Sequence, residues 1–381
     1  MVFESSCQDA TVSEPKFITP SSADGVEDFR VKVVNPLLLL GETVLTSFVV
    51  GIVPPQNGYE CVAMYGRLWH QHTMPDNVPK RPGVDPAPGS RAQIKTLTEV
   101  CIDDLLDALG LSRLRRSRRP LELLIRIPGR RLARQIATYD EIVGKFGLSA
   151  GGEWALERMT RRLKVEGGER VPRDGSLLLV SNHPGLSDAV ALFASIPRPD
   201  LRVVASEWPL LDVLPNTSRH LLTIAENSAS RLGAIRAAAR HLRGGGALLN
   251  FPAGRMEPDP AVMPGAVEAL GRWSANVDLF ARLAPNLTIV PVVVSGVLSP
   301  AAFGNPLTRL RRPEEDRRWL ASNLQMLVPA LRNVSPRVTF GPPIRDSAGE
   351  TISTIVLPEV RRLMERHTED RKRTHDSSHA S

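Results

Sequence analysis

A histidine and an aspartate five residues apart are the side chains in this sequence best suited to carry out a reaction. His183 and Asp188 lie in the segment SNHPGLSDAV, directly after a short apolar run. Pro184 and Gly185 favour a sharp turn between them, which can bring the carboxylate back to the imidazole. A carboxylate in that position fixes the tautomer of a histidine and stabilises the cation formed when the histidine takes up a proton. The pattern therefore predicts that His183 is a general base and that Asp188 orients it.

Two later segments place further motifs at the ends of apolar runs. Residues 250–255, NFPAGR, follow one run, and Pro291 lies inside another, IVPVVV. In α/β proteins the carboxyl ends of the strands form the edge where ligands bind. Gly254 would let backbone N–H groups approach a developing oxyanion there, and Arg255 would neutralise a phosphate or carboxylate. These motifs weigh against a simpler interpretation, in which the aspartate only caps a helix and the histidine lies on the surface.

In their order along the chain, these motifs resemble the phospholipid and glycerolipid acyltransferases related to lysophosphatidate acyltransferase. That family has four blocks: an N-H-x4-D box, a second block with basic residues, an F-P-x-G box and a V-P-V strand. The resemblance covers roughly residues 150 to 345. The matching segments are Asn182-His183-x4-Asp188, the stretch 203–224, Phe251-Pro252-Ala253-Gly254 and Ile289-Val290-Pro291-Val292.

The resemblance implies an activity. A fatty acyl group would move from a coenzyme A or acyl carrier protein thioester to a hydroxyl of a lysophospholipid or glycerolipid-type acceptor, with His183 as base and Asp188 as its orienter. No metal and no nucleotide cofactor are implied, only acyl-CoA or acyl-ACP as co-substrate. The residues predicted to bind substrates are Asn182, Phe251, Pro252, Gly254, Arg255 and Pro291.

The sequence departs from the family pattern where the acceptor would bind. The third box commonly has Glu before its glycine, whereas this chain has Ala253. The second block commonly ends in an arginine that binds the acceptor phosphate, whereas here Ile224 is followed by AEN. Arg255 is the best-placed replacement for that arginine. Trp208 fits either an acyl groove or the core. The donor chemistry therefore carries over better than the identity of the acceptor.

Two other functions remain open. A thioester hydrolase would use the same His/Asp pair to activate water, and only the acceptor site separates it from a transferase. A non-catalytic homologue that binds lipid or membrane would explain the departures from the pattern, although both His183 and Asp188 are present.

The elements that must position these residues follow from the apolar periodicity. After residue 176, short apolar runs alternate with segments of helical period, which is typical of a sheet covered by helices on both faces. We therefore predict an α/β fold with a mostly parallel central sheet flanked by helices. The predicted strands are 177–181, 201–205, 221–224, 247–251, 287–294 and 337–340, and the predicted helices are 187–196, 228–243, 264–283, 314–333 and 351–367.

The chain of 381 residues is long enough for one large domain with extensions. Residues 1–90 are rich in Pro, Ser, Gly and Asp and are predicted to form a loosely ordered, partly disordered N-terminal arm and linker. Residues 91–165 are predicted to form a helical, Arg-rich extension, with helices over 120–146 and 152–164 and a break near Pro128 and Gly129. The acyltransferase α/β domain would span 166–368, and 369–381 would be a charged, frayed tail.

Charge and composition predict the surroundings in which the chain works. With 48 Lys and Arg against 41 Asp and Glu the net charge is +7, which favours polyanionic partners. Over residues 111–135, nine arginines with one glutamate are mixed with Leu and Ile, a pattern that suits either an anionic membrane surface or a solvated helix face. The stretch has no interleaved aromatics, so nucleic acid is not expected. The arginines are Arg113, Arg115, Arg116, Arg118, Arg119, Arg126, Arg130, Arg131 and Arg134.

The remaining signals indicate a cytoplasmic protein that associates peripherally with the membrane. Three widely spaced cysteines without a CxxC pair fit a reducing compartment, and the polar start of the chain has no secretion-signal pattern. The apolar stretch 37–53 contains Glu42 and is short for a membrane span, so we expect a buried or interfacial helix there.

Overall fold

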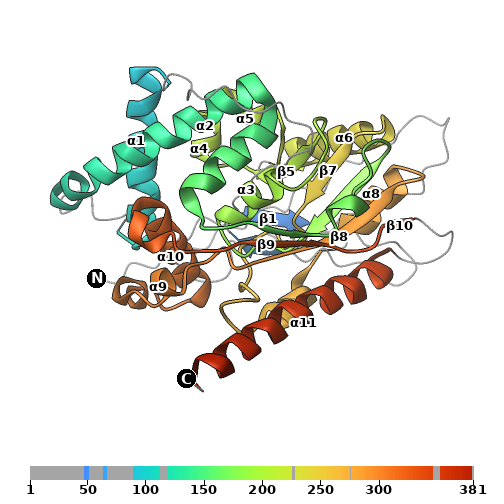
Figure 1. The fold of residues 1–381 in the computed structure, drawn as a ribbon. Coiled ribbons are helices and arrows are strands. Elements are labelled where there is room, and N and C mark those ends of the chain that lie inside the picture. Colours follow the sequence, from blue (N-terminus) through green and yellow to red (C-terminus); the bar gives the residue numbers. More distant parts are fainter. Residues whose placement is uncertain are drawn as a thin grey trace, which may run out of the picture.

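The computed structural model describes residues 47–50, 63–66, 89–111, 119–224, 228–274, 276–345 and 352–379. In this part of the chain, eight strands form one sheet in the order β3-β9-β8-β4-β7-β5-β6, with β10 paired to β8 (Figure 1). The strands are β3 (Lys164–Glu166), β4 (Leu177–Ser181), β5 (Arg202–Ser206), β6 (Leu221–Ile224), β7 (Ala247–Asn250), β8 (Thr288–Ser295), β9 (Arg337–Phe340) and β10 (Ile344–Arg345).

The centre of the sheet is parallel, as the alternation of apolar runs and helical segments predicts. β4 pairs in parallel with β7 and β8, and β5 pairs in parallel with β6 and β7. β9 and β10 pair antiparallel with β8, and β3 at the edge pairs in parallel with β9 and so runs in the same direction as β9. The fold class predicted from the sequence, a mostly parallel sheet flanked by helices, is therefore confirmed.

Eleven α-helices and four short 3-10 helices accompany the sheet within the described residues. The α-helices are α1 (Arg91–Ala108), α2 (Arg119–Met159), α3 (Ser187–Phe193), α4 (Pro209–Asp212), α5 (Pro215–Ser218), α6 (Ser228–Arg243), α7 (Ala266–Ala269), α8 (Asn276–Leu283), α9 (Pro300–Phe303), α10 (Glu314–Leu327) and α11 (Ile352–His379). The 3-10 helices are η2 (Gly168–Arg170), η3 (Leu270–Arg272), η4 (Pro306–Leu310) and η5 (Pro329–Leu331). A separate antiparallel pair joins β1 (Ser47–Val50) to β2 (Ala63–Gly66).

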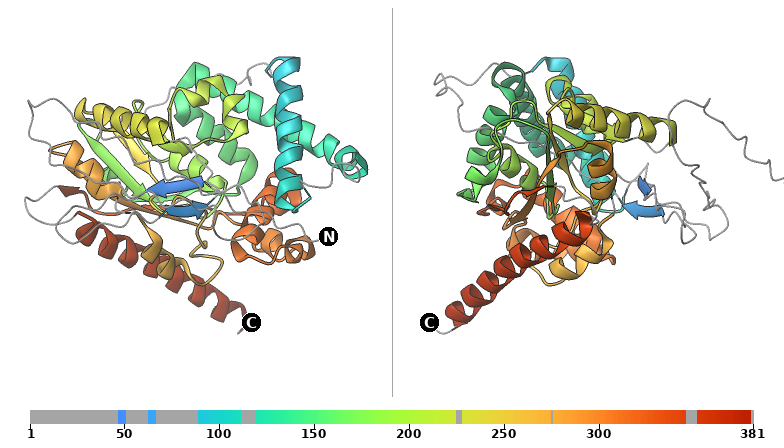
Figure 2. Two further views of the ribbon diagram at one scale, coloured as in Figure 1. Left: turned by 180° about the vertical axis from the view of Figure 1, so that it is seen from behind. Right: turned by 90° about the vertical axis from the view of Figure 1, so that its right-hand side faces the viewer.

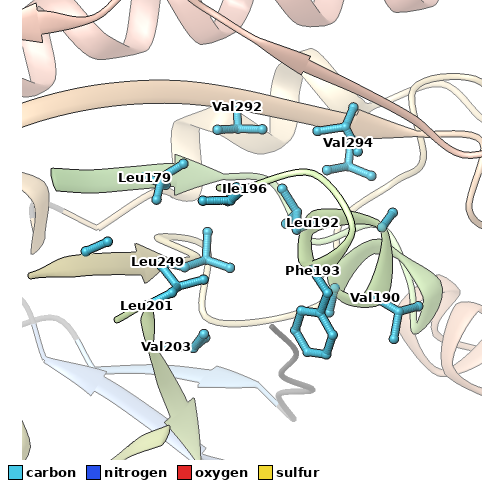
Figure 3. Packing of buried hydrophobic residues seen from close by; sticks show 14 of the residues in the cluster. Leu179, Val190, Leu192, Phe193, Ile196, Leu201, Val203, Leu249, Val292 and Val294 are labelled. Carbon is cyan, nitrogen blue, oxygen red and sulfur yellow. The ribbon is translucent and has the colours of Figure 1, made fainter. Parts of the chain in front are cut away.

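Alternate residues of the buried strands point to opposite faces of the sheet. Leu177 and Leu179 of β4 belong to a core that also contains side chains of α2 and α3. Figure 3 shows Leu179 in this core with Leu192 and Phe193 of α3. Leu178 and Val180 belong to a second core that includes side chains of α6, α7, α8 and α11. Each fully buried leucine contributes about 1.5–3 kcal/mol through burial, so both helical layers are held to the sheet mainly by apolar contact.

The helices divide between the two ends of the molecule. Helices α1, α9 and α10 gather at one end, and α6 and α8 lie at the other (Figures 1 and 2). Helix α2 packs closely on α3, because a Cβ added at Gly152 would lie 2.3 Å from the Cβ of Phe193. Among the described helices, none combines the length and apolar character needed to cross a bilayer.

The position of the break in the Arg-rich helix was predicted wrongly. Helix α2 continues through Pro128 and Gly129, where Gly129 is buried close to Ile102 of α1. The break comes at Gly147, directly after residue 146, where the first of the two expected helices ends; its φ of 86° and ψ of 170° are essentially restricted to glycine. Packing between α1 and α2 therefore outweighs the local effect of the proline.

Other element boundaries also differ from the prediction. The helix expected at 152–164 ends at Met159, and Lys164–Glu166 form β3 because they complete the edge of the sheet beside β9. The helix expected at 264–283 is divided into α7, η3 and α8, and α10 ends before the expected residue 333. Residues 47–50 form a strand where a helix was expected. Helix α11 extends into the segment predicted to fray.

Candidate active site

His183 and Asp188 form the hydrogen bond that the sequence predicts. The Nδ1 atom of His183 lies 2.7 Å from Oδ2 of Asp188, and both side chains are completely buried. An ionised carboxylate can only accept, so Nδ1 carries the proton and Nε2 is the nitrogen left to take up another. The pair thus has the geometry of a histidine base held by a carboxylate.

The short loop between β4 and α3 holds this carboxylate in place. Oδ2 of Asp188 also accepts the N–H of Gly185 at 3.1 Å, and Oδ1 accepts the N–H of Ala189 at 2.6 Å. These bonds fold the loop around the carboxylate. Asp188 therefore binds an N–H of the first turn of α3 and also orients His183. The simpler interpretation, with His183 on the surface, is wrong, because the imidazole is completely buried.

Asn182 uses its side chain to extend the sheet. Its Nδ2 donates to the carbonyl of Val294 at 2.9 Å, and its Oδ1 accepts the N–H of Val294 at 2.8 Å. The amide thus replaces a backbone pairing just beyond the last ladder pair, Ser181 with Val292. This arrangement fixes the residue next to His183 relative to β8. Contact of Asn182 with a substrate stays a prediction.

The third box lies directly beside the histidine. The ring centroids of Phe251 and His183 are 4.9 Å apart. The carbonyl of Pro252 accepts bonds from both the N–H and the hydroxyl of Ser274, at 3.1 and 3.0 Å. Gly254 has φ 63°, and its own N–H donates to the carbonyl of Phe251 at 3.1 Å. The glycine therefore closes a tight turn that presses Phe251 towards the base.

Arg255 points to a partner on α10. Its Nη1 lies 3.2 Å from Oε2 of Glu315, and the two side chains are 19% and 34% exposed. A partly exposed pair of this kind is worth little stability, so an anionic group could exchange with Glu315 at small cost. The predicted role of Arg255 in binding an acceptor stays a prediction.

Pro291 occupies a central strand, where its missing N–H must be accommodated. It pairs with Val180 on one side of β8, and its carbonyl accepts the N–H of Gly341 at 2.7 Å on the other. Gly341 lies in the break between β9 and β10, so the strand that would need the absent donor is interrupted there. Pro291 is thus explained by the sheet, and its predicted contact with substrate is untested.

A second buried carboxylate, not predicted from the sequence, contacts His183. Oε2 of Glu257 accepts the N–H of His183 at 3.0 Å, and the N–H of Glu257 donates to the carbonyl of His183 at 2.8 Å. Oε1 of Glu257 accepts Nε1–H of Trp273 at 2.7 Å. Burial raises the pKa of Glu257 to about 7, although these hydrogen bonds and the charges of His183 and Arg272 act to lower it.

Asp259, two residues further along, secures the loop after β8. Its carboxylate accepts the N–H groups of Gly296, Val297 and Leu298 at 2.8–3.0 Å, and also that of Ala261 at 2.9 Å. Burial raises the pKa of Asp259, and the backbone hydrogen bonds oppose this effect. The segment after β7 therefore ties together the loops that follow β4 and β8. The sequence signal that could have predicted both carboxylates is the presence of acidic residues just after the F-P-x-G box.

An apolar cavity of about 100 Å³ is lined in part by α2 and α3. Leu186, from the loop that carries the histidine, is part of its wall. Phe251 belongs to the same hydrophobic cluster as the wall residues Trp154 and Phe193, with Trp208 packed against it. The full lining is Leu132, Gln135, Ile136, Tyr139, Trp154, Ala155, Arg158, Met159, Leu186, Val190, Phe193, Trp208, Leu210, Leu211, Leu214, Thr217 and Met326.

Comparison with known proteins gives a limited result. No family model and no curated protein matches the chain. Among solved structures, the chain is similar to the crystal structure of the 1-acyl-sn-glycerophosphate (LPA) acyltransferase PlsC from Thermotoga maritima. The alignment covers 72% of this chain and 94% of that one, with 15% identity and a TM-score of 0.34. A likeness at this level does not assign the chain to a family.

Proposed function

We propose that this protein is an O-acyltransferase that moves a fatty acyl group from an acyl-CoA or acyl-ACP thioester to a hydroxyl of a lysophospholipid or glycerolipid-type acceptor. The observation that carries the proposal is the buried hydrogen bond of 2.7 Å between His183 and Asp188 at the carboxyl end of β4. The F-P-x-G box packed against that histidine, in the order along the chain that the acyltransferases have, supports the same function.

In the proposed reaction, Nε2 of His183 takes the proton of the acceptor hydroxyl as its oxygen attacks the thioester carbonyl. Asp188 stabilises the imidazolium that forms. The tetrahedral intermediate then expels the thiolate sulfur, which receives the proton from His183, so that an ester and a free thiol are the products. The residues of the chain begin and end the cycle in the same protonation state.

Substrate binding must open the site, because His183 and Asp188 have no exposed surface. Phe251 lies against the imidazole, so displacement of this ring would give an acceptor access to it. We assign Phe251 and Pro252 to the wall that covers the base, and Gly254 to the turn that lets this wall approach. Exclusion of water by such a wall favours transfer to an alcohol over hydrolysis.

The apolar cavity is the proposed site of the acyl chain. Leu186, in the loop that carries His183, lines it together with side chains of α2, α3 and the α4–α5 segment. Each methylene buried there contributes about 0.8 kcal/mol to binding. Trp208 lines this cavity and donates its Nε1–H to Asp104 at 3.2 Å, so it combines a place in the wall with a link to α1.

The start of α2 is the proposed contact with an anionic membrane surface. Leu123, Leu124 and Ile127 are 69%, 74% and 81% exposed, although they are large apolar side chains. The exposed Arg126 and Arg130 lie on the same stretch of helix. Leucines that enter the interface and arginines that bind lipid phosphate match the chemistry of such a surface. Arg113, Arg115, Arg116 and Arg118 lie outside the described residues.

The decisive experiment follows both products of one labelled donor. Purified protein is incubated with acyl-chain-labelled acyl-CoA and, separately, acyl-ACP, together with a panel of lysophospholipids, glycerol 3-phosphate and neutral alcohols. Mass spectrometry should find an ester that depends on His183. Release of label only as free acid would identify a thioester hydrolase. Binding of lipid with no product from any donor would identify a non-catalytic homologue.

A further inference from the structure

Glu257 holds the main chain of His183 at both of its polar groups. The carboxylate accepts the N–H of His183 at 3.0 Å, and the N–H of Glu257 donates to the carbonyl of His183 at 2.8 Å. Both residues are buried, with Glu257 1% exposed and His183 0% exposed. Backbone groups buried in this way are costly to release, so this pair of bonds restricts rotation of the main chain that carries the imidazole.

Trp273 completes the surroundings of the carboxylate. Its indole N–H donates to Oε1 of Glu257 at 2.7 Å, while the N–H of His183 donates to Oε2. Each carboxylate oxygen therefore accepts one N–H. A protonated carboxyl would turn one oxygen into a hydroxyl donor facing an N–H, so these partners suit the ionised form.

We propose that Glu257 is a positioning residue for His183: it fixes the main chain of the histidine and places a second negative charge beside the ring that becomes positive. The inference rests on the proposed function, in which His183 is the base. Asp188 holds the ring at Nδ1, and Glu257 holds the backbone, so the two carboxylates act on different parts of one residue. The charges of Glu257 and His183 interact, so the imidazolium formed in the reaction is stabilised by both carboxylates.

The charge state of Glu257 makes this role sensitive to pH. Burial raises its pKa to about 7, against the lowering effects of Trp273, of the N–H and charge of His183, and of Arg272. Glu257 therefore gains or loses its charge near neutral pH. Turnover depends on the ionised form, because only that form accepts both N–H groups and stabilises the cation.

Glu257→Gln tests the role with the least change in shape. Glutamine fills the same space, but it carries no charge and has only one acceptor oxygen for the two N–H groups. We expect kcat to fall by about 10- to 100-fold, less than the roughly 10²- to 10³-fold for a group that touches the reacting atoms, while the KM for the acyl donor stays within about twofold. The acid limb of the pH–rate profile should move to lower pH. Glu257→Asp, which keeps the charge, should restore the wild-type profile at reduced kcat.

Asp200→Asn is the matched control. Asp200 pairs with the buried Arg198, which also donates to the carbonyls of Pro172, Gly175 and Gly245. Gly175 and Gly245 lie near the starts of β4 and β7 and thus at the edge opposite the site. This variant removes a charge from a carboxylate bonded to a buried group, so it should lower stability without changing kcat or the pH profile. A wild-type kcat and pH profile in Glu257→Gln would overturn the proposal.

Two measurements test Glu257 independently of turnover. The chain has five tryptophans, so the indole N–H region of an NMR spectrum is simple, and Trp273→Phe assigns the signal of interest. This signal should shift with a midpoint near pH 7 in the wild type and still titrate in His183→Gln, but not in Glu257→Gln. A signal that stays constant from pH 5 to 9 would contradict the assigned ionisation.

The second measurement reports the main chain of His183. In protein labelled with ¹⁵N-histidine, eight amide signals are expected, and His183→Gln assigns one of them. The His183 amide should exchange with deuterium at least about tenfold faster in Glu257→Gln than in the wild type, and at the wild-type rate in Asp200→Asn. Equal exchange rates in the wild type and Glu257→Gln would contradict the positioning role. A wild type that transfers no acyl group would instead count against the proposed function and leave the exchange result valid.

Discussion

Asn182 and Val294 exchange two hydrogen bonds in which a side-chain amide takes the place of a strand residue. The distances are 2.9 Å from Nδ2 to the Val294 carbonyl and 2.8 Å from the Val294 N–H to Oδ1. Ladder pairing between β4 and β8 ends at Ser181, so this amide links the two strands one step further, directly before His183. The asparagine of the N-H-x4-D box therefore has a structural reason to be present.

Replacing Asn182 should destabilise the fold. Asn182→Ala leaves the N–H and carbonyl of Val294 buried without their partner, and each such loss costs about 1–3 kcal/mol. We expect the free energy of unfolding to fall by about 2–5 kcal/mol, measured by urea denaturation with an unchanged m-value. Asn323→Ala is the control, because Nδ2 of that buried asparagine donates to the carbonyl of Trp319 within its own helix. If both variants lower the free energy of unfolding by the same amount, the Asn182 bonds stabilise the fold no more than a side-chain bond within one helix.

The catalytic pair should respond differently to the loss of either member. Since His183 removes the proton of the attacking hydroxyl, His183→Ala should lower turnover by about 10²- to 10⁴-fold with little change in donor affinity. Asp188→Asn keeps an oxygen acceptor for the nearby N–H groups but presents either that oxygen or an NH₂ group to Nδ1, so it should also be strongly impaired while still folding. Circular dichroism checks the fold, and product formation checks the rate. Near-wild-type transfer by His183→Ala would end the assignment of the base.

The buried Glu257 should make stability depend on pH in a defined direction. Its pKa is raised from 4.5 to about 7 in the folded chain, so folding favours the neutral form. The associated stability is fully present below about pH 4.5 and is lost as pH rises through about 7, by roughly 3 kcal/mol. Glu257→Gln mimics the neutral form. Its stability relative to the wild type should therefore increase between pH 5 and pH 8, as measured by urea unfolding at each pH.

That prediction also separates stability from activity. At pH 8 the Gln variant should be at least as stable as the wild type and yet turn over more slowly, a combination that simple loss of structure cannot produce. A stability difference that does not change with pH would show that Glu257 keeps its ordinary ionisation.

Membrane binding should depend on both kinds of side chain at the start of α2. Replacing Leu124 and Ile127 by Ser removes exposed apolar surface, whereas replacing Arg126 and Arg130 by Gln removes charge. Both double variants should sediment less with phosphatidylserine-containing vesicles. The binding that remains in the Ser variant should fall steeply as salt rises, because its arginines are intact, whereas the binding that remains in the Gln variant should not.

The matched control lies on α6, at the other end of the molecule (Figure 1). Arg236, Arg240 and Arg243 are exposed there, and their replacement by Gln removes even more charge. Vesicle binding should stay at the wild-type level in this variant. If the α6 variant loses as much binding as the α2 variants, net charge rather than a defined surface is responsible.

The sequence predicts the parts of the site that depend on local pattern, and not those that depend on contacts between distant segments. Strands β4, β6 and β9 and helix α6 begin and end where the apolar runs indicate, and the His183–Asp188 bond follows from a five-residue turn. Glu257 was missed because its partner is 74 positions away, on a different strand end. The uninterrupted helix at Pro128 was not predicted because packing on α1 decides it, whereas the break at Gly147 lies directly after the helix end expected at residue 146.

The acceptor site is where the sequence departs most from the acyltransferases it resembles, and the pairing of Arg255 with Glu315 makes a two-sided test possible. The two side chains are 3.2 Å apart and partly exposed, so a phosphate on the acceptor would compete with Glu315 for the guanidinium. Arg255→Met should raise the apparent KM for a phosphorylated acceptor by about 10-fold or more and leave a neutral acceptor unaffected. Glu315→Gln should act in the opposite direction, lowering that KM a few-fold, because it removes the competitor and leaves the arginine.

Lys at position 255 should recover part of the loss seen in Arg255→Met, since a point charge attracts phosphate but cannot bind it through two parallel bonds. Asp316→Asn is the control, because Asp316 lies on the same turn of α10 as Glu315 but pairs with Arg311, which precedes the helix, and not with Arg255. Gly254→Val should slow transfer to every acceptor, since valine at φ 63° would distort the turn that carries Phe251. If Arg255→Met and Glu315→Gln both leave the preference between phosphorylated and neutral acceptors unchanged, Arg255 does not bind the acceptor, and an uncharged alcohol becomes the better substrate hypothesis.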